Sequence, residues 1–353
     1  ARVYEAAKGT ESILNRLFGV ESQLVEPGLT QGRFLQKFAK GTRQRVPDVL
    51  ANIARVVAKR KHLLRQDMLR VHNALDDATL MKIGGAVDFD EYPVHAQNRA
   101  SQEARNEAVG RDMQRLRAFA ERAGERPFYF VPRIWSQQRA GLSENAVNPQ
   151  SSKVQRHFIN MAAWKTQVTP GSHSDEEIRF KLAVAQGMGI DVDKMRNERS
   201  LEALESLMAR PDVAAAVAAL QRVEALGPDE KLMPEEQAAV VAVTARAENF
   251  HSLDALVNWA AYDSARKNNT SFSTSMMFEV DGVTNGPALA HVLLGHAGPL
   301  ADAFGMYGED SEYTGFTDYK STPGNLDLYE TVARDVMQNM AQVATRTLAG
   351  ICL

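Results

Sequence analysis

The sequence FEVDGVTNGP, which spans Phe278–Pro287, places one carboxylate between an apolar run and a glycine-rich turn. The preceding residues, Thr270–Val280, carry β-branched and aromatic side chains in partial alternation, which predicts a strand. The residues that follow, Gly286–Gly295, predict a helix with a proline in its first turn. We therefore expect Asp281 at the end of a rigid strand, directly before a turn and a helix.

Two interpretations of Asp281 are open. A carboxylate on a strand end suits a Mg²⁺ ligand, and the carbonyl of Gly282 could face the same ion. Two-metal phosphoryl transfer would need a second carboxylate from elsewhere. The alternative is an aspartate that caps the helix near Pro287, with Gly286 forming the turn. The residues by themselves favour the cap.

A second candidate lies upstream, in the sequence WSQQRAGLSENAVNPQS of residues 135–151. Arg139 follows an expected strand, Arg126–Trp135, and precedes an irregular loop that contains an Asn-Pro turn. A guanidinium in that position can hold phosphate oxygens bidentately. The alternative is a surface arginine beside an ordinary turn.

Positive charge is concentrated in one segment. Arg33–Arg70 contains eleven Lys or Arg and two acidic residues, an excess of nine positive charges. Because the whole chain carries −3, the remainder carries −12, which predicts one basic surface on an acidic body. We expect a helix over Val49–Val71, with basic residues that include Arg55, Lys59, Lys61 and Arg65. A solvated helix face is the favoured interpretation of these residues, and a helix that contacts nucleic-acid phosphates is the alternative.

The composition excludes several classes of protein. The chain has 353 residues, of which 44% are hydrophobic and 24% charged, as in globular proteins with more than one domain. No apolar run is long enough to span a bilayer, and no signal-peptide pattern is present. The single cysteine, Cys352, rules out an internal disulfide framework and a cysteine-based metal site. We expect the chain to be part of a larger protein.

Helical spacing dominates and predicts a mainly α fold with a small antiparallel β element (α+β). It marks residues 33–40, 94–124 (as one helix or two) and 250–266, among others. Ser174 with Glu177 predicts a capping box, and Pro211 and Pro234 predict helix starts. We expect four regions: a helical region 1–125 with the basic segment 33–70; a strand and loop with Arg139 over 126–174; a helical subdomain 175–248; and 249–353 with the segment 278–287 and a closing helix.

Two motifs, in this order, resemble the single-subunit RNA polymerases. VDGVTNGP resembles their motif A, and in particular that of the virion-packaged RNA polymerases of Schitoviridae (enquatrovirus-type) phages. FVPRIWSQQRAG and the following NPQS look like that family's motif with a Gly-Arg pair, although Gln138 stands where the family has glycine. STPGNLDLYETV is also similar, and VHAQNRAS and AQGMGIDV are similar more weakly. The resemblance covers about residues 93–340.

The resemblance implies a partial right-hand polymerase fold, with 1–125 on the thumb side and 249–353 as the early palm. Asp281 would be the first of two catalytic carboxylates and would bind Mg²⁺ together with the Gly282 carbonyl. Asn285 and Gly286 would shape the floor under the incoming nucleotide, and Arg139 would contact the template–transcript hybrid or the transcript. The sequence lacks patterns for motifs B and C, so we expect activity to need residues beyond this chain.

The implied reaction is nucleotidyl transfer from NTPs to the 3′ end of RNA by a two-metal mechanism. The implied partners are template DNA, the RNA transcript, NTPs, the remainder of the polymerase and other virion ejection proteins. The implied setting is the virion interior, followed by the host cytoplasm after injection. An alternative from another class is a virion-internal structural or ejection protein delivered with the phage genome. A helical protein with a chance Asp-Gly turn is a third hypothesis.

Overall fold

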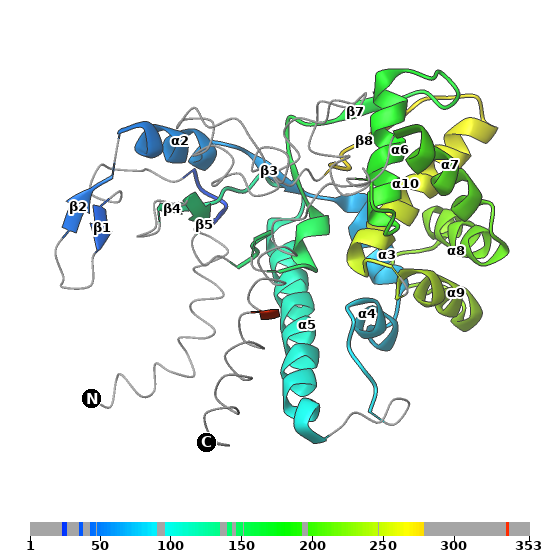
Figure 1. Cartoon of the computed structure of the whole chain (residues 1–353), viewed down its shortest axis with the longest axis horizontal. Coiled ribbons are helices and arrows are strands. Elements are labelled where there is room, and N and C mark those ends of the chain that lie inside the picture. The colour runs from blue at the N-terminus through cyan, green and yellow to red at the C-terminus, as the bar shows by residue number, and fades with distance from the viewer. Residues whose placement is uncertain are drawn as a thin grey trace, which may run out of the picture. The chain divides into compact units, whose positions relative to one another are not determined.

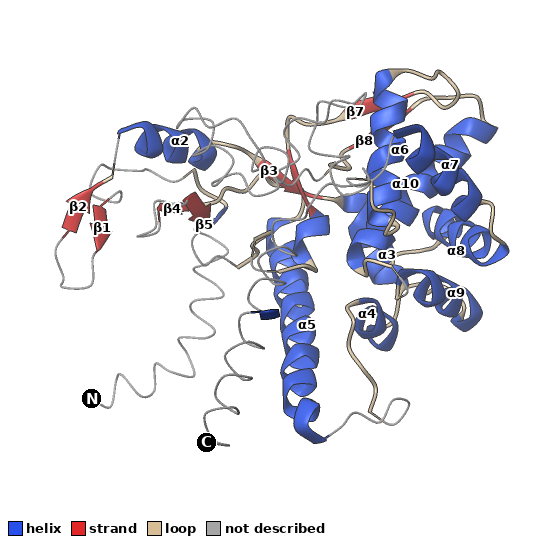
Figure 2. Cartoon of the chain, in the orientation of Figure 1, coloured by secondary structure: helices blue, strands red, loops and turns tan. Residues whose placement is uncertain are grey.

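The computed structural model describes residues 23–26, 35–37, 43–46, 48–89, 96–134, 140–142, 146–150, 152–192, 197–245, 247–278 and 337–338. Helices dominate these residues, and the short strands pair antiparallel in twos (Figures 1 and 2). The predicted mainly α fold with small antiparallel β elements is confirmed. The chain divides into two compact units, Ala1–Phe180 with Met208–Met276, and Lys181–Leu207 with Met277–Leu353.

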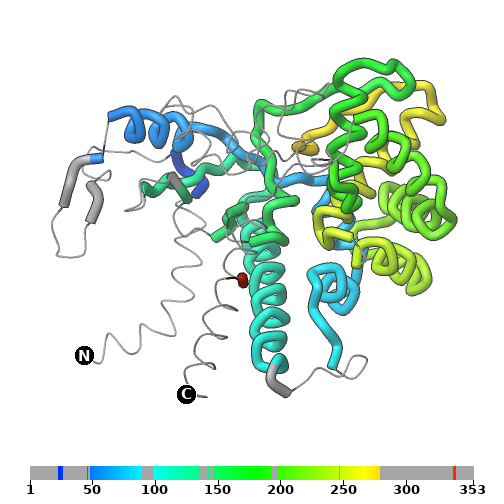
Figure 3. The backbone as a smooth tube through the Cα atoms, viewed as in Figure 1, coloured from blue at the N-terminus to red at the C-terminus, as the bar shows by residue number. Residues whose placement is uncertain are grey.

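The backbone path is drawn in Figure 3. The helices are α2 (Asp48–Ala58), α3 (Gln66–Ala74), α4 (Asp77–Ile83), α5 (Ala96–Ala123), α6 (Asp175–Gly187), α7 (Asn197–Met208), α8 (Pro211–Arg222), α9 (Pro234–Thr244) and α10 (Phe250–Lys267), with the 3₁₀ turns η2 (Gln155–Phe158) and η3 (Val223–Ala225). The strand pairs are β1 (Leu35–Lys37) with β2 (Arg43–Arg45), β3 (His62–Leu64) with β6 (Ile159–Met161), β4 (Pro132–Ile134) with β5 (Ala140–Leu142), and β7 (Thr166–Val168) with β8 (Phe272–Thr274).

Several helices begin and end where the sequence predicts. Pro211 and Pro234 occupy the first turns of α8 and α9, where a missing N–H leaves no hydrogen bond unmade. The segment 94–124, expected as one helix or two, contains the single helix α5, and the helix expected over 250–266 is α10. In the larger unit, α8 packs against α9 and α10, and α3 also contacts α10.

The start of α6 is a capping box in an extended form. The N–H of Glu177 donates to Ser174 Oγ at 3.4 Å, as predicted. The Glu177 carboxylate, however, accepts from the N–H groups of Gly171 and His173, at 2.8 and 2.7 Å. These two residues have positive φ values of 79° and 54°, so the buried carboxylate holds a left-handed turn in place. It also accepts from the hydroxyl of Tyr262, at 2.6 Å.

Two predictions of continuous helix are wrong. The basic segment expected to form one helix over Val49–Val71 is α2 and α3 with the strand β3 between them. β3 pairs with β6, in the register Leu63↔Asn160, so a partner almost a hundred residues away overrides the local spacing. Residues 35–37, expected as helix, form β1 against β2. The strand expected over Arg126–Trp135 is reduced to β4, preceded by an isolated bridge at Phe128.

An aromatic cluster joins α5 to the strands. Phe119, Phe128 and Phe130 are almost fully buried, and their rings meet edge to face with centroids 5.0 and 5.6 Å apart. The ring of His62 meets Phe130 in the same way, at 4.7 Å. Burying each phenylalanine contributes roughly 2–3 kcal/mol, so this cluster anchors β3 and the segment before β4 to α5.

The β7–β8 ladder brings together two segments that are far apart in the chain. Its register is Thr166↔Thr274 and Val168↔Phe272. One residue further on, the hydroxyls of Thr169 and Ser271 lie 2.7 Å apart. All these residues belong to the larger unit. Among the residues that the structure describes, no helix is both long and apolar enough to cross a membrane.

Candidate ligand and nucleic-acid sites

The residues of the expected catalytic site lie outside the described residues. They are Asp281, Gly282, Asn285, Gly286 and Arg139. Among the residues that the structure does describe, no group of three or more His, Cys, Asp or Glu could hold a metal ion. Magnesium binding by Asp281 and Gly282 stays a prediction.

Three of the four basic candidates lie at the junction of α2 and β3. Arg55, in the last turn of α2, is half-buried and donates to the side chain of Asn52 at 2.7 Å. Lys59 and Lys61 are exposed, and they follow the helix on the way into β3. An exposed pair of lysines within three positions is available to a phosphate backbone.

The fourth basic candidate, Arg65, is on the inside of the larger unit. Its side chain is 3% exposed, so it does not share a surface with Lys59 and Lys61. Its Nε and Nη2 donate to the two carboxylate oxygens of Asp67, at 3.3 and 2.6 Å. Its Nη1 donates to the carboxylate of Asp254 on α10. The guanidinium is therefore directed at two carboxylates of the protein itself.

Asp254 is held by several groups at once. Its second oxygen lies 3.3 Å from Nδ1 of His157, and the amide nitrogen of Asn258 donates to its first oxygen at 2.7 Å. Asn258 in turn accepts from the hydroxyl of Thr274 in β8 at 2.6 Å. Burial alone would raise the pKa of Asp254, but the charge of Arg65 and the hydrogen bonds from His157 and Arg65 outweigh it and hold that pKa below its usual value. Asp254 is thus a buried carboxylate that stays ionised.

The pKa of Arg65 is shifted in the opposite direction to that of Asp254, so that both groups stay charged. Burial alone would lower the pKa of its guanidinium, but the charges of Asp254 and Asp67 raise that pKa above its usual value. The two residues form a buried ion pair, and further hydrogen bonds from Arg65 to Asp67 and to the His157 carbonyl, and from Asn258 to Asp254, support it, as buried pairs require.

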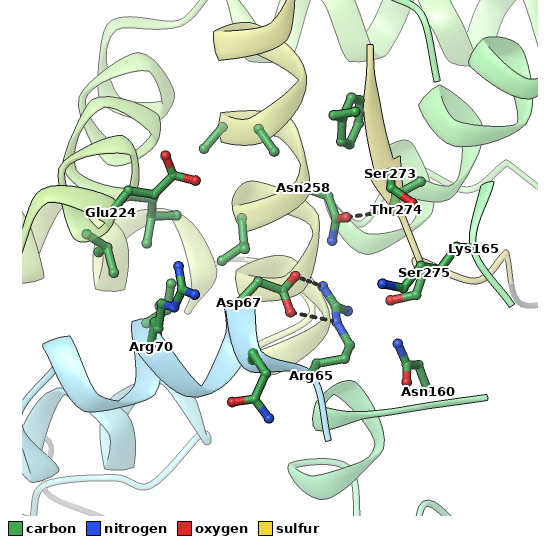
Figure 4. Close-up of a pocket in the computed structure, with 18 of the residues that line it drawn as sticks. Arg65, Asp67, Arg70, Asn160, Lys165, Glu224, Asn258, Ser273, Thr274 and Ser275 are labelled. Atoms are coloured by element: carbon green, nitrogen blue, oxygen red, sulfur yellow. Dashed lines mark hydrogen bonds and ion pairs between the residues drawn. The ribbon is translucent and has the colours of Figure 1, made fainter. Parts of the chain in front are cut away.

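A cavity of about 520 Å³ adjoins this ion pair, inside the larger unit (Figure 4). Its walls come from α3, the end of α8 with η3, α10, β8 and the turn between β6 and β7. The volume is that of a typical small-molecule site. Its charged lining residues are Arg65, Arg70, Lys165, Asp67, Glu125 and Glu224.

Sequence reasoning did not single out the residues that build this region. Asp254 and Asn258 lie four positions apart among apolar residues of α10, on the face that the fold buries. A polar pair on an apolar helical face is a sign of buried hydrogen bonding, and it could have been noticed. The partner of Asp254 could not, because Arg65 is 189 positions away.

Two family models match consecutive parts of this chain. The model described as virion DNA-directed RNA polymerase domain matches residues 50–159, and the model described as virion DNA-directed RNA polymerase, plug insertion, matches residues 176–263. The class they define is the DNA-directed RNA polymerase of phage virions. The chain belongs to this family, and it carries one of its domains followed by its plug insertion.

A curated relative supports the same assignment. The chain is similar to the virion DNA-directed RNA polymerase of Enterobacteria phage N4, with 22% identity over 291 residues. That match covers 78% of this chain and 8% of the relative, so the chain spans a small part of the protein it matches. The Arg65–Asp254 ion pair joins a residue of the first matched segment to a residue of the plug insertion.

Proposed function

We propose that this chain is part of a phage DNA-directed RNA polymerase that needs residues beyond it for activity. The reaction is attack of the RNA 3′ hydroxyl on the α-phosphate of an NTP, with release of pyrophosphate. The observation that carries the proposal is the match to two successive segments of one polymerase family, followed shortly after β8 by the motif VDGVTNGP.

In this proposal Asp281 and the Gly282 carbonyl hold Mg²⁺, which supplies charge neutralisation and orientation in phosphoryl transfer. Asn285 and Gly286 lie under the incoming nucleotide, and Arg139 contacts the hybrid or the transcript. A carboxylate and a carbonyl oxygen are ligands that Mg²⁺ accepts, so the residue types fit the ion. The second carboxylate comes from outside this chain.

The nucleic-acid partners in this proposal are template DNA and the RNA transcript. Lys59 and Lys61, with Arg55 beside them, contact phosphates from the α2–β3 junction. Arg65 supports them indirectly, because it fixes the start of α3 through its two carboxylate partners. The polymerase is carried in the virion and acts in the host cytoplasm after injection.

The test is Asp281→Asn in the complete polymerase, measured as incorporation of labelled NTP into RNA on a denatured DNA template with Mg²⁺. We expect a loss of about a hundredfold or more, because the variant removes a charge that positions both metals. Asp229→Asn, an exposed carboxylate between η3 and α9, is the matched control and should transcribe normally.

Unchanged transcription by Asp281→Asn would refute the assigned site. A complete protein that makes no RNA in any variant, yet leaves the virion with the genome, would instead favour the structural or ejection function.

A further inference from the structure

One end of the cavity is built by three polar side chains from two ladders. Asn160 comes from β6 and Lys165 from the residue before β7, and both line the cavity with Ser275. The register Thr166↔Thr274 places the preceding Lys165 opposite the following Ser275. This end of the cavity is called the polar end below.

A tight turn brings Asn160 to the same place. The N–H of Trp164 donates to the carbonyl of Met161 at 2.9 Å, so the chain reverses between β6 and β7. Asn160 and Lys165 flank that turn. In Figure 4 the amide nitrogen of Asn160 points toward Ser275 and Lys165.

The Asn160 side chain is buried but not satisfied. Only 8% of the residue is exposed, and among the described residues its Oδ1 has no hydrogen-bond partner. A buried polar group without a partner costs about 1–3 kcal/mol, so folds rarely leave one without a use. This orphaned Oδ1 is an acceptor. The donor that a phosphate oxygen could use is the amide nitrogen of the same side chain, which has no partner among the described residues and faces Ser275 and Lys165.

Lys165 and Ser275 also have side chains without a hydrogen-bond or ion-pair partner among the described residues. The part of the chain that the structure describes places no carboxylate within ion-pair distance of Lys165 and no hydrogen-bond partner at the Ser275 hydroxyl. Arg65, by contrast, is neutralised by Asp67 and Asp254. The polar end thus offers an ammonium, an amide N–H and a hydroxyl, a set of donors that suits the oxygens of a phosphate.

The rest of the cavity determines what can be attached to that phosphate. Apolar side chains also line the cavity, among them Leu63, Val71, Leu220, Val223, Val257 and Phe272. At the other end Glu224 and Asp67 lie near Arg70 in Figure 4. Arg70 accompanies these carboxylates and Asp67 is paired with Arg65, whereas Lys165 at the polar end has no carboxylate within ion-pair distance among the described residues. A ligand with a phosphate at one end and a flat, largely apolar ring at the other matches it.

We infer that this cavity binds a nucleotide, with a phosphate at Lys165, Asn160 and Ser275 and the base against the apolar wall. The inference rests on the proposed function only in that a polymerase works among nucleotides. The residues that carry it are separate from Asp281, so the two assignments can fail independently.

The test measures binding of ATP to the full chain by titration against a fluorescent ATP analogue, with adenosine and inorganic phosphate as competitors. The variants are Lys165→Gln and Asn160→Leu. Lys82→Gln, which removes an exposed lysine of α4 outside the cavity, is the matched control. Each variant is also melted, and Asp281→Asn is titrated in parallel.

We expect Lys165→Gln and Asn160→Leu each to weaken ATP binding by about tenfold, the effect of one charged or buried hydrogen bond. Lys82→Gln and Asp281→Asn should bind ATP normally. Asn160→Leu should melt no lower than the parent chain, because it removes an unpaired buried amide rather than a bond. Loss of binding without loss of stability separates a ligand contact from a structural role.

Several results would overturn the inference. One is the absence of ATP binding at about 1 mM, where even weak sites fill. Another is ATP binding that Lys165→Gln and Asn160→Leu leave unchanged, or that only Asp281→Asn weakens. If adenosine competes as well as ATP, the site does not recognise the phosphate. If single-stranded DNA binds through these residues and ATP does not, the cavity is a DNA-binding site instead.

Discussion

The carboxylate of Asp254 accepts a hydrogen bond from the guanidinium of Arg65, which lies 189 positions earlier in the chain. Their side chains are only 8% and 3% exposed. Taking either charge out of water alone would cost several kcal/mol, so each is tolerated because the other is there. The pair joins α10, within the plug insertion, to the start of α3.

Removing one partner of this pair should be strongly destabilising. We expect Asp254→Asn to lower the free energy of unfolding by about 3 kcal/mol, because Arg65 stays buried with only the half-exposed Asp67. Urea denaturation of the full chain measures it. Glu103→Gln, which breaks an exposed pair with Arg99 on α5, is the control and should change little.

The same experiment has an internal check. The double variant Arg65→Met with Asp254→Leu should lose less stability than Asp254→Asn, because it leaves no charge unpaired. If Asp254→Asn unfolds at the same urea concentration as the parent chain, this pair does not exist in solution.

Stability should fall as the solution is acidified below neutrality, and His72 is one cause. Burial lowers the pKa of His72 to about 4, and the charge of Arg117 acts in the same direction. Between about pH 6.5 and pH 4 the unfolded chain therefore binds a proton that the folded chain does not. The free energy of unfolding should drop by up to about 3 kcal/mol across that window.

His72→Phe isolates this contribution. Its ring would keep the edge-to-face contact with Phe158, at 5.7 Å in the parent chain, and it removes a buried Nε2 that has no partner among the described residues. Urea denaturation at several pH values should show a flatter profile, with a residual slope from His62, whose pKa burial also lowers. An unchanged profile would mean that His72 is not buried as neutral imidazole.

Glu177 should be far more important to stability than its neighbour. Glu177→Ala removes the acceptor for the Gly171 and His173 N–H groups and for the Tyr262 hydroxyl, so we expect a loss of about 2–4 kcal/mol. Glu176→Ala alters the next, exposed carboxylate and should have little effect. Thermal melting compares the two, and equal effects would contradict the role of Glu177 in the turn.

The lysines of the α2–β3 junction should control nucleic-acid binding. We expect Lys59→Glu with Lys61→Glu to weaken DNA binding by the complete polymerase and to reduce the salt slope by about 1–2, since each lost phosphate contact removes roughly 0.7–0.9. Filter binding at several salt concentrations measures both. Lys82→Glu carries half the charge change on a different helix, α4, and an equal effect there would indicate only a general loss of positive charge.

Local patterns predicted the helices well, because their determinants lie within a few residues. The prolines at 211 and 234 open α8 and α9, and the spacing over 94–124 gives one helix. Prediction failed where a distant partner decides. β3 interrupts the basic segment because β6, almost a hundred residues away, pairs with it. The missed strand β1 is a different case, since its partner β2 follows closely in the chain.

The functional residues divide in the same way. Lys59 and Lys61 are exposed as a basic segment suggests, since charged side chains need no special partner to remain in water. The sequence predicts Arg65 to be a fourth exposed residue of that segment. It is buried instead, because Asp254 on α10 provides its counter-charge. The polar end of the cavity could not be anticipated, since only the pairing of the distant strands β7 and β8 brings Ser275 opposite Lys165.

The β7–β8 ladder has a consequence for how the chain could be edited. The hundred or so residues between Val168 and Phe272 begin and end at the same edge of this ladder, where the hydroxyls of Thr169 and Ser271 form a hydrogen bond. A short hairpin turn could connect those two ends without rerouting the backbone on either side. The segment between these two residues nevertheless carries Asp254, so removing it would leave the buried guanidinium of Arg65 without this carboxylate. The covalent path would therefore allow this segment to be removed, whereas the buried ion pair and the packing of α10 against α3 hold it in the larger unit.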